Sequence, residues 1–84
     1  MSFYVYILES ATTGRLYIGQ TNDLSDRLVR HNSGRNKYTA GKGPWVLLFS
    51  KLMPGRAEAY QLEQQLKSWK NPSKVRAWIQ LQSG

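Results

Sequence analysis

Two short runs of strand-forming residues lie near the start of the chain, separated by a segment typical of a tight turn. Residues 3–8 and 16–20 are rich in β-branched, aromatic and long aliphatic side chains, and residues 10–14 between them are small, polar or glycine. Such a pattern predicts a β-hairpin. The hairpin limits the fold, because every later element must pack on one of its two faces.

The length of the turn determines which residues face each other across the hairpin. A four-residue loop over residues 10–13 pairs Glu9 with Gly14 and therefore Tyr6 with Tyr17. Opposed residues of antiparallel strands have Cβ atoms about 4.5–5.5 Å apart, so the two hydroxyls are expected to share one substrate group. This holds only in that register, because a slip of one residue reverses the faces. The structural alternative is an aromatic pair that merely covers the sheet.

A helix of about nine residues is predicted to follow the hairpin. Asn22 is the N-cap candidate, and carboxylates in the first turn suit the helix dipole. Leu24 and Leu28 form the buried stripe. Arg27 and His31, four residues apart, are aligned on a neighbouring stripe and therefore face one place.

Three more elements complete the predicted fold. A glycine-rich loop over residues 32–44 leads to residues 45–51, whose nearly continuous apolar run is typical of a central strand and is expected to join the hairpin. Residues 56–70 and 73–80 predict two further helices, with Ser73 as N-cap of the last. The fold class is α+β, a small three-stranded antiparallel sheet flanked by helices in the order β-β-α-β-α-α.

The second of these three helices carries a carboxylate beside its packing face. The apolar residues that recur at helical spacing are Ala59, Leu62, Leu66 and Trp69. At about 100° per residue, Glu63 lies roughly 80° from the centre of that stripe and can reach the sheet surface. The structural alternatives are ion pairs of Glu63 with Lys67 and of Arg27 with Asp23, each at standard helix spacing.

Size and composition exclude several classes of protein. The 84 residues predict a single domain over residues 1–84 with a modest core. The chain has no cysteine, so disulfides and thiolate zinc clusters are excluded. The start has no basic leader and only a short apolar run, from which we expect a soluble, cytoplasmic protein.

The charge balance points towards polyanions. Twelve basic and five acidic residues give a net charge of +7, and no acid occurs between Asp26 and Glu58. Basic runs bind phosphate backbones by releasing counterions. A basic surface that serves only solubility is the alternative. The candidates for nucleic-acid contact are Arg27, Arg30, Arg35, Lys37, Lys42, Lys67, Lys70 and Lys74.

The order of five polar residues resembles the GIY-YIG nuclease family. Tyr4-Val5-Tyr6 occupies the place of the family's first triplet, with tyrosine in place of glycine, and Tyr17-Ile18-Gly19 matches the second in full. Arg27, His31 and Glu63 continue the match. The sequence looks closest to small stand-alone bacterial members related to the amino-terminal domain of the excinuclease C subunit.

This resemblance implies a metal-dependent endonuclease of repair or processing type that hydrolyses DNA phosphodiester bonds. Glu63 would be the sole protein carboxylate on one Mg²⁺ or Mn²⁺ ion, which keeps most of its water. Arg27 would clamp the phosphate, and Tyr6, beside Tyr17, would help to take a proton from the attacking water. His31 would have one of two roles: it would orient the attacking water or accept a proton itself.

The resemblance also indicates how the chain would be targeted to its substrate. Larger members attach a separate DNA-binding domain, so a chain of this size would be targeted by its own basic surface, by a protein partner or by a second copy of itself. DNA, including branched or damaged DNA, is the expected substrate, and RNA is the alternative. A non-catalytic nucleic-acid-binding or recruitment module with the same scaffold is the rival function.

Overall fold

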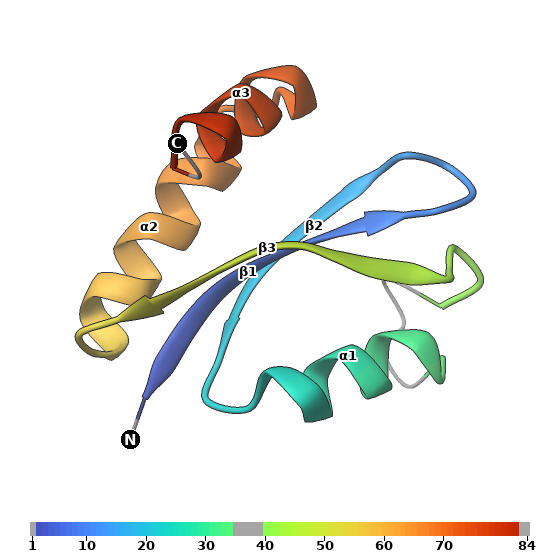
Figure 1. Ribbon diagram of the computed structural model, residues 1–84, viewed down its shortest axis with the longest axis horizontal. Coiled ribbons are helices and arrows are strands. Elements are labelled where there is room, and N and C mark those ends of the chain that lie inside the picture. The colour runs from blue at the N-terminus through green and yellow to red at the C-terminus, as the bar shows by residue number, and fades with distance from the viewer. Residues whose placement is uncertain (1, 35–39, 83–84) are drawn as a thin grey trace.

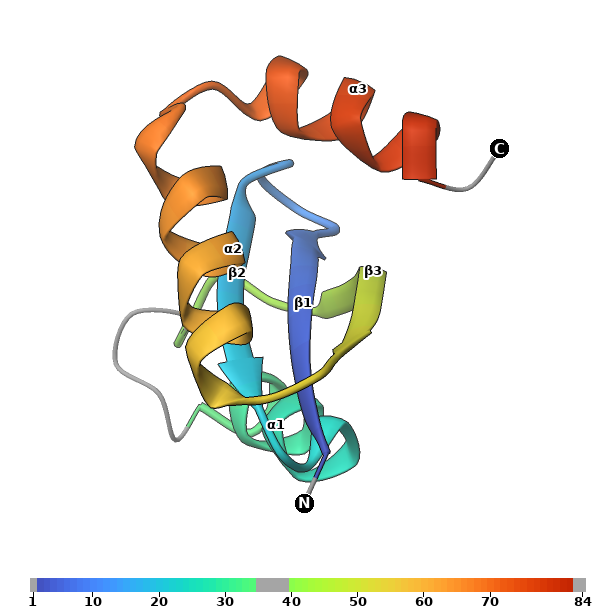
Figure 2. The same cartoon turned by 90° about the vertical axis from the view of Figure 1, so that its left-hand side faces the viewer.

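The chain forms three strands and three helices in the predicted order. The computed structural model describes residues 2–34 and 40–82. Its elements are β1 (Phe3–Ser10), β2 (Leu16–Thr21), α1 (Leu24–Asn32), β3 (Trp45–Met53), α2 (Arg56–Ser68) and α3 (Pro72–Gln82). The strands make one antiparallel sheet in the order β2-β1-β3; α1 lies on one face, and α2 and α3 lie on the other (Figures 1 and 2). This arrangement confirms the α+β fold.

The central strand is β1, and the expectation that residues 45–51 would be central is wrong. Residues 5–8 of β1 are all buried, because helices cover both faces of this strand. β3 lies at the edge and leaves several apolar side chains exposed: Val46, Leu47, Leu48 and Leu52. A bulge in β3 shifts its pairing with β1 between Ile7 and Leu8, so the strand does not keep a simple alternation. The continuous apolar run therefore reflects a bulged edge strand.

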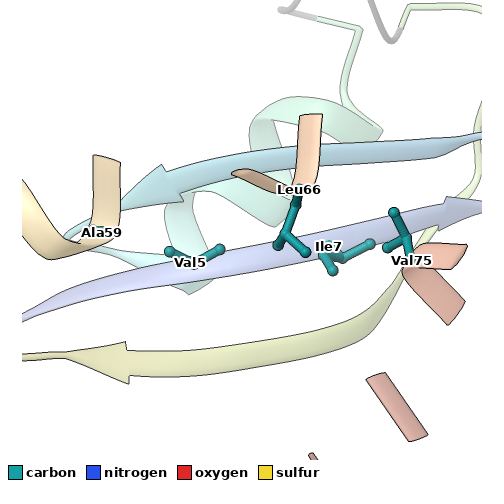
Figure 3. Close-up of a cluster of buried hydrophobic side chains, with 5 residues drawn as sticks. All are labelled: Val5, Ile7, Ala59, Leu66 and Val75. Carbon is teal, nitrogen blue, oxygen red and sulfur yellow. The ribbon is translucent and has the colours of Figure 1, made fainter. Parts of the chain in front are cut away.

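The larger core lies between the sheet and the pair α2 and α3. Its buried side chains come from β1 and both helices, namely Val5, Ile7, Ala59, Leu66 and Val75 (Figure 3). Phe49 of β3 meets Trp78 of α3 edge to face, with ring centroids 5.1 Å apart. Complete burial of one such aliphatic side chain contributes about 1.5–3 kcal/mol. Within the described residues, no helix has the length and apolar character needed to cross a membrane.

A smaller core lies between the sheet and α1. Tyr6, Leu8 and Trp45 are buried there, and the predicted stripe of Leu24 and Leu28 packs against them. Alternation along β1 thus sends its odd-numbered side chains to the larger core and its even-numbered ones to this cluster.

Two helix caps differ from expectation. Asp23 rather than Asn22 caps α1, since its side chain accepts a hydrogen bond from the backbone N–H three residues later. Asn71 rather than Ser73 caps α3, accepting from the backbone N–H of Ser73 at 3.0 Å. Pro72 then occupies the first helical position, where its lack of an N–H costs nothing.

The register of the hairpin also differs from expectation. Tyr6 pairs with Gly19, so Tyr17 lies two residues along β2 from the predicted position. Gly14 explains the difference: it adopts φ +75°, a left-handed conformation that suits glycine, and belongs to a loop over residues 11–14 rather than to a strand. Because the displacement is an even number of residues, Tyr6 and Tyr17 still share one face as diagonal neighbours.

Candidate functional site

Three aromatic side chains from three elements meet on the α1 side of the sheet. Tyr6 comes from β1, Tyr17 from β2 and His31 from α1. The ring centroids of Tyr6 and Tyr17 are 6.2 Å apart, and those of Tyr17 and His31 are 4.5 Å apart. The Tyr6 hydroxyl and Nε2 of His31 form a buried hydrogen bond of 3.1 Å. The predicted convergence of Tyr6, Tyr17 and His31 is therefore present.

Gly19 allows the Tyr6 ring to occupy this position. A Cβ atom added to Gly19 would lie 2.7 Å from the Tyr6 hydroxyl oxygen and 2.8 Å from Cζ. Carbon atoms do not approach so closely, so any other residue at position 19 would force the ring away. Gly19, the last residue of the second triplet, thus leaves room for the ring of Tyr6, the tyrosine of the first triplet.

We predict that Gly19→Ala displaces the Tyr6 ring and lowers the free energy of unfolding by about 1–3 kcal/mol, the usual cost of overpacking. Aromatic NOEs between Tyr6 and His31, together with thermal unfolding, would measure both effects. Gly55→Ala is the matched control for the NOEs, because its added Cβ meets only the flexible end of Glu58, at 3.1 Å; its own effect on stability comes from the N-cap of α2, where alanine is disfavoured. Unchanged NOEs in Gly19→Ala would contradict the steric argument.

A side chain next to His31 fastens the end of α1 to the sheet. Oδ1 of Asn32 accepts a 2.6 Å hydrogen bond from the backbone N–H of Trp45, and its Nδ2 donates to the Trp45 carbonyl at 3.1 Å. The Trp45 ring meets Tyr17 edge to face at 6.5 Å. Asn32 and Trp45 therefore position His31 and Tyr17. Sequence reasoning missed this role, for which the only signal was an asparagine directly after the histidine.

The protonation states follow from burial and neighbouring charges. Burial raises the pKa of Tyr6 well above its ordinary value, and Tyr17 and Glu63 add to the rise, while Arg27 opposes it. Burial also lowers the pKa of His31, and the positive charge of Arg27 lowers it further. At neutral pH the phenol is therefore protonated and the imidazole is neutral. Which of the two atoms donates in the contact between the Tyr6 hydroxyl and Nε2 depends on the tautomer of the neutral imidazole.

Arg27 and Glu63 supply the charges around this cluster. Arg27 is exposed on α1, one turn before His31, and Glu63 of α2 is 8% exposed. The charge of Arg27 lowers the pKa of Tyr6 and that of Glu63 raises it, whereas the direct contacts of the cluster are those among Tyr6, Tyr17 and His31. Glu63 also accepts a 2.6 Å hydrogen bond from Nζ of Lys67. This is the ion pair that the sequence predicted as the structural alternative for Glu63. No ion pair joins Arg27 to Asp23, both of which lie in described segments.

A cleft of about 650 Å³ adjoins the cluster at the outer edge of β2. It lies against the junction of α2 and α3, and Tyr17 and Lys67 belong to its lining. The complete lining is Arg15, Leu16, Tyr17, Ile18, Leu66, Lys67, Lys70, Asn71, Pro72 and Val75. Lys67 and Lys70 were predicted to contact nucleic acid, whereas Arg15 was not.

The other predicted nucleic-acid contacts that lie in the described segments do not line this cleft. Arg30 forms a surface ion pair with Asp26 at 2.8 Å, and Nζ of Lys74 lies 4.9 Å from the centre of the Trp69 ring. The carbonyl of Lys42 accepts a hydrogen bond from a side chain of the hairpin loop. Arg35 and Lys37 fall outside the described residues.

The acidic side chains favour one kind of metal site. Among residues 2–34 and 40–82, no three His, Cys, Asp or Glu side chains gather as a metal cage. The single buried carboxylate of Glu63 fits a divalent ion that takes its remaining ligands from water and substrate, as Mg²⁺ does. It does not fit a structural zinc centre, which needs four protein ligands.

Comparisons with known proteins agree with the fold. A UPF0213 protein from Nitratidesulfovibrio vulgaris is 42% identical over 66 residues, which are 77% of this chain and 59%, less than two thirds, of that protein. Another, from Bacillus pumilus, is 42% identical over 72 residues, 84% of this chain and 72% of that protein. The solution NMR structure of the UPF0213 protein BH0048 from Bacillus halodurans matches with a TM-score of 0.64 at 36% identity, over 100% of this chain and 88% of that one. The family model of the GIY-YIG catalytic domain matches residues 2–76, and the chain therefore belongs to the GIY-YIG family.

Proposed function

We propose that this protein is a metal-dependent endonuclease that hydrolyses phosphodiester bonds of DNA. The observation that carries the proposal is the buried hydrogen bond between Tyr6 and His31, together with the charges of Arg27 and Glu63, which both shift the pKa of Tyr6. A purely structural aromatic pair needs neither a proton acceptor nor a buried acid. A proton acceptor, a cation and a carboxylate are the groups that phosphodiester hydrolysis requires.

The Tyr6–His31 pair provides a path for a proton. In the proposed reaction an attacking water loses a proton to the Tyr6 oxygen as Tyr6 passes its own proton to Nε2 of His31. The water oxygen forms the new bond to phosphorus, and the bond from phosphorus to the 3′ oxygen breaks. Tyr6 then needs no stable phenolate, which its raised pKa disfavours. The lowered pKa of His31 keeps the imidazole neutral, and the proposed path uses the tautomer whose Nε2 carries no proton.

The charged residues supply the remaining functions. Arg27 donates to the phosphate oxygens, where negative charge increases in the transition state. Glu63 would hold the divalent ion, which when bound polarises the phosphate and supports the departing oxygen. Lys67 neutralises the same carboxylate through its ion pair and must give way when Glu63 takes up a cation. Its released ammonium group can then bind a neighbouring phosphate of the substrate.

Cleavage assays with and without a metal ion test the proposal. Single-stranded, duplex, branched and supercoiled DNA, and RNA, would each be incubated with Mg²⁺ or Mn²⁺ and, in parallel, with a chelator. We expect cleavage of at least one DNA substrate that the chelator abolishes. Binding that persists in chelator, with no cleavage of any substrate, would instead favour a non-catalytic nucleic-acid-binding module.

The proton path predicts the pH dependence of cleavage. Protonated His31 cannot accept a proton, so kcat/KM should fall as the pH drops through the pKa of His31. Because that pKa is lowered, the midpoint of the fall should lie below about 6.5, the ordinary value for histidine. A pH–rate profile measures it, and His31→Gln should remove this limb. A midpoint above the ordinary value would count against His31 as the acceptor.

A further inference from the structure

We propose that the cleft beside β2 binds one unpaired nucleotide next to the bond that is cleaved, so that the substrate is single-stranded or locally unpaired there. This inference rests on the proposed nuclease function and names its substrate class. The cleft of about 650 Å³ falls within the range of pockets that enclose small ligands.

The lining of the cleft combines an apolar floor with a cationic rim. The apolar side chains are Leu16, Ile18, Leu66, Pro72 and Val75. The rim carries Arg15, Lys67 and Lys70, and no carboxylate lines the cleft. A nucleotide has the complementary division, a flat and weakly polar base attached to a charged phosphate. A purely apolar ligand would make no ion pair with the cationic side chains, and a small anion would leave the apolar side chains exposed to water.

The backbone at Lys70 gives a second indication. Lys70 adopts φ +50° and is the one residue other than glycine with a positive φ among residues 2–34 and 40–82. It lies in the turn between α2 and α3, where glycine is the usual choice for this conformation. A lysine at this position costs backbone strain and places its chain at the rim of the cleft.

The cleft and the candidate active site share Tyr17, which lies on β2 at the edge of the sheet. Tyr17 lines the cleft and packs against Tyr6 and His31, and Lys67 lines it and holds Glu63. A nucleotide in the cleft would therefore have its phosphate beside the residues of the proposed reaction. A base in a duplex is stacked on both faces and cannot enter, whereas an unpaired or flipped base can.

Binding measurements in chelator test the inference separately from cleavage. Glu63→Gln protein would be titrated by fluorescence anisotropy with a 12-nucleotide single strand, its duplex, a duplex carrying one unpaired nucleotide, and the single strand with one central base removed. We expect the single strand and the interrupted duplex to bind more tightly than the intact duplex. Loss of the base should weaken binding about tenfold, because all phosphates remain but the contact of the base with the apolar side chains is lost.

Substitutions inside and outside the cleft test whether the single strand binds there. Arg15→Gln and Lys70→Gly should each weaken binding of the single strand roughly three- to tenfold, since each removes one phosphate contact. Lys70→Gly should also raise the melting temperature, because glycine adopts a positive φ without strain, so weaker binding there cannot come from unfolding. Lys51→Gln, an equal loss of charge on β3 outside the cleft, should change the affinity less than about twofold.

Equal affinity for the intact and base-free strands, or for single strand and duplex, would overturn the inference even if the protein cleaves DNA. Wild-type affinity in both Arg15→Gln and Lys70→Gly would do the same. Cleft-dependent binding without any cleavage would support the nucleotide site and remove the proposed nuclease function.

Discussion

Replacing Glu63 with glutamine is expected to lower metal-dependent cleavage by about 10³-fold or more, because several kcal/mol of transition-state stabilisation would be lost with the metal. Glutamine keeps the shape of the side chain but has no negative charge for a divalent ion. The fold should survive, since the broken pair with Lys67 is half exposed on the lysine side and contributes about 1 kcal/mol or less.

Cleavage rates over a Mn²⁺ titration, with isothermal calorimetry of Mn²⁺ binding, would measure this effect. Glu58→Gln is the matched control: it removes an exposed acid from the first turn of the same helix and should leave the rate unchanged. Wild-type rates in Glu63→Gln would mean that the buried acid serves only its ion pair with Lys67.

Tyr6→Phe is the second substitution with a large expected effect. It removes one oxygen atom and leaves the ring that packs over Gly19. Loss of a group that transfers a proton in the transition state usually costs about 10²–10⁴ in rate. The buried Nε2 of His31 would also lose its hydrogen-bond partner, which lowers the free energy of unfolding by about 1–3 kcal/mol. Single-turnover cleavage and thermal unfolding measure the two effects.

Tyr60→Phe controls for the chemistry of this change, because Tyr60 is 55% exposed on α2 and should tolerate loss of its hydroxyl. If Tyr6→Phe cleaves at the wild-type rate, the proton must leave the water by another path. His31 acting directly on the water would then be the next assignment to test.

The sequence predicted the type and order of every element, because hydrophobic periodicity differs clearly between strands and helices. It did not predict the register of the hairpin. That depended on whether Gly14 ended the loop or began the strand, a choice decided by one backbone angle. It also placed β3 in the centre of the sheet, since an apolar run does not reveal a bulge or an exposed edge.

The residues of the candidate site were found from the sequence for a different reason. Five side chains in a fixed order resembled a known family, and three of them, Tyr6, Tyr17 and His31, are in contact in spite of the error in register. The contributions of Arg15 and Asn32 were not predicted, because they depend on how distant segments meet. Contacts of that kind leave no periodic trace in a sequence.

The central position of β1 ties activity to global stability. This strand pairs on both sides and contributes Tyr6 to one face and Ile7 to the other, so the site and the larger core share a single backbone segment. Separating β1 from either neighbouring strand would therefore disrupt both the site and the larger core. A substitution that weakens the larger core is therefore expected to disturb the site as well, so selection acts on stability and on the geometry of the site together.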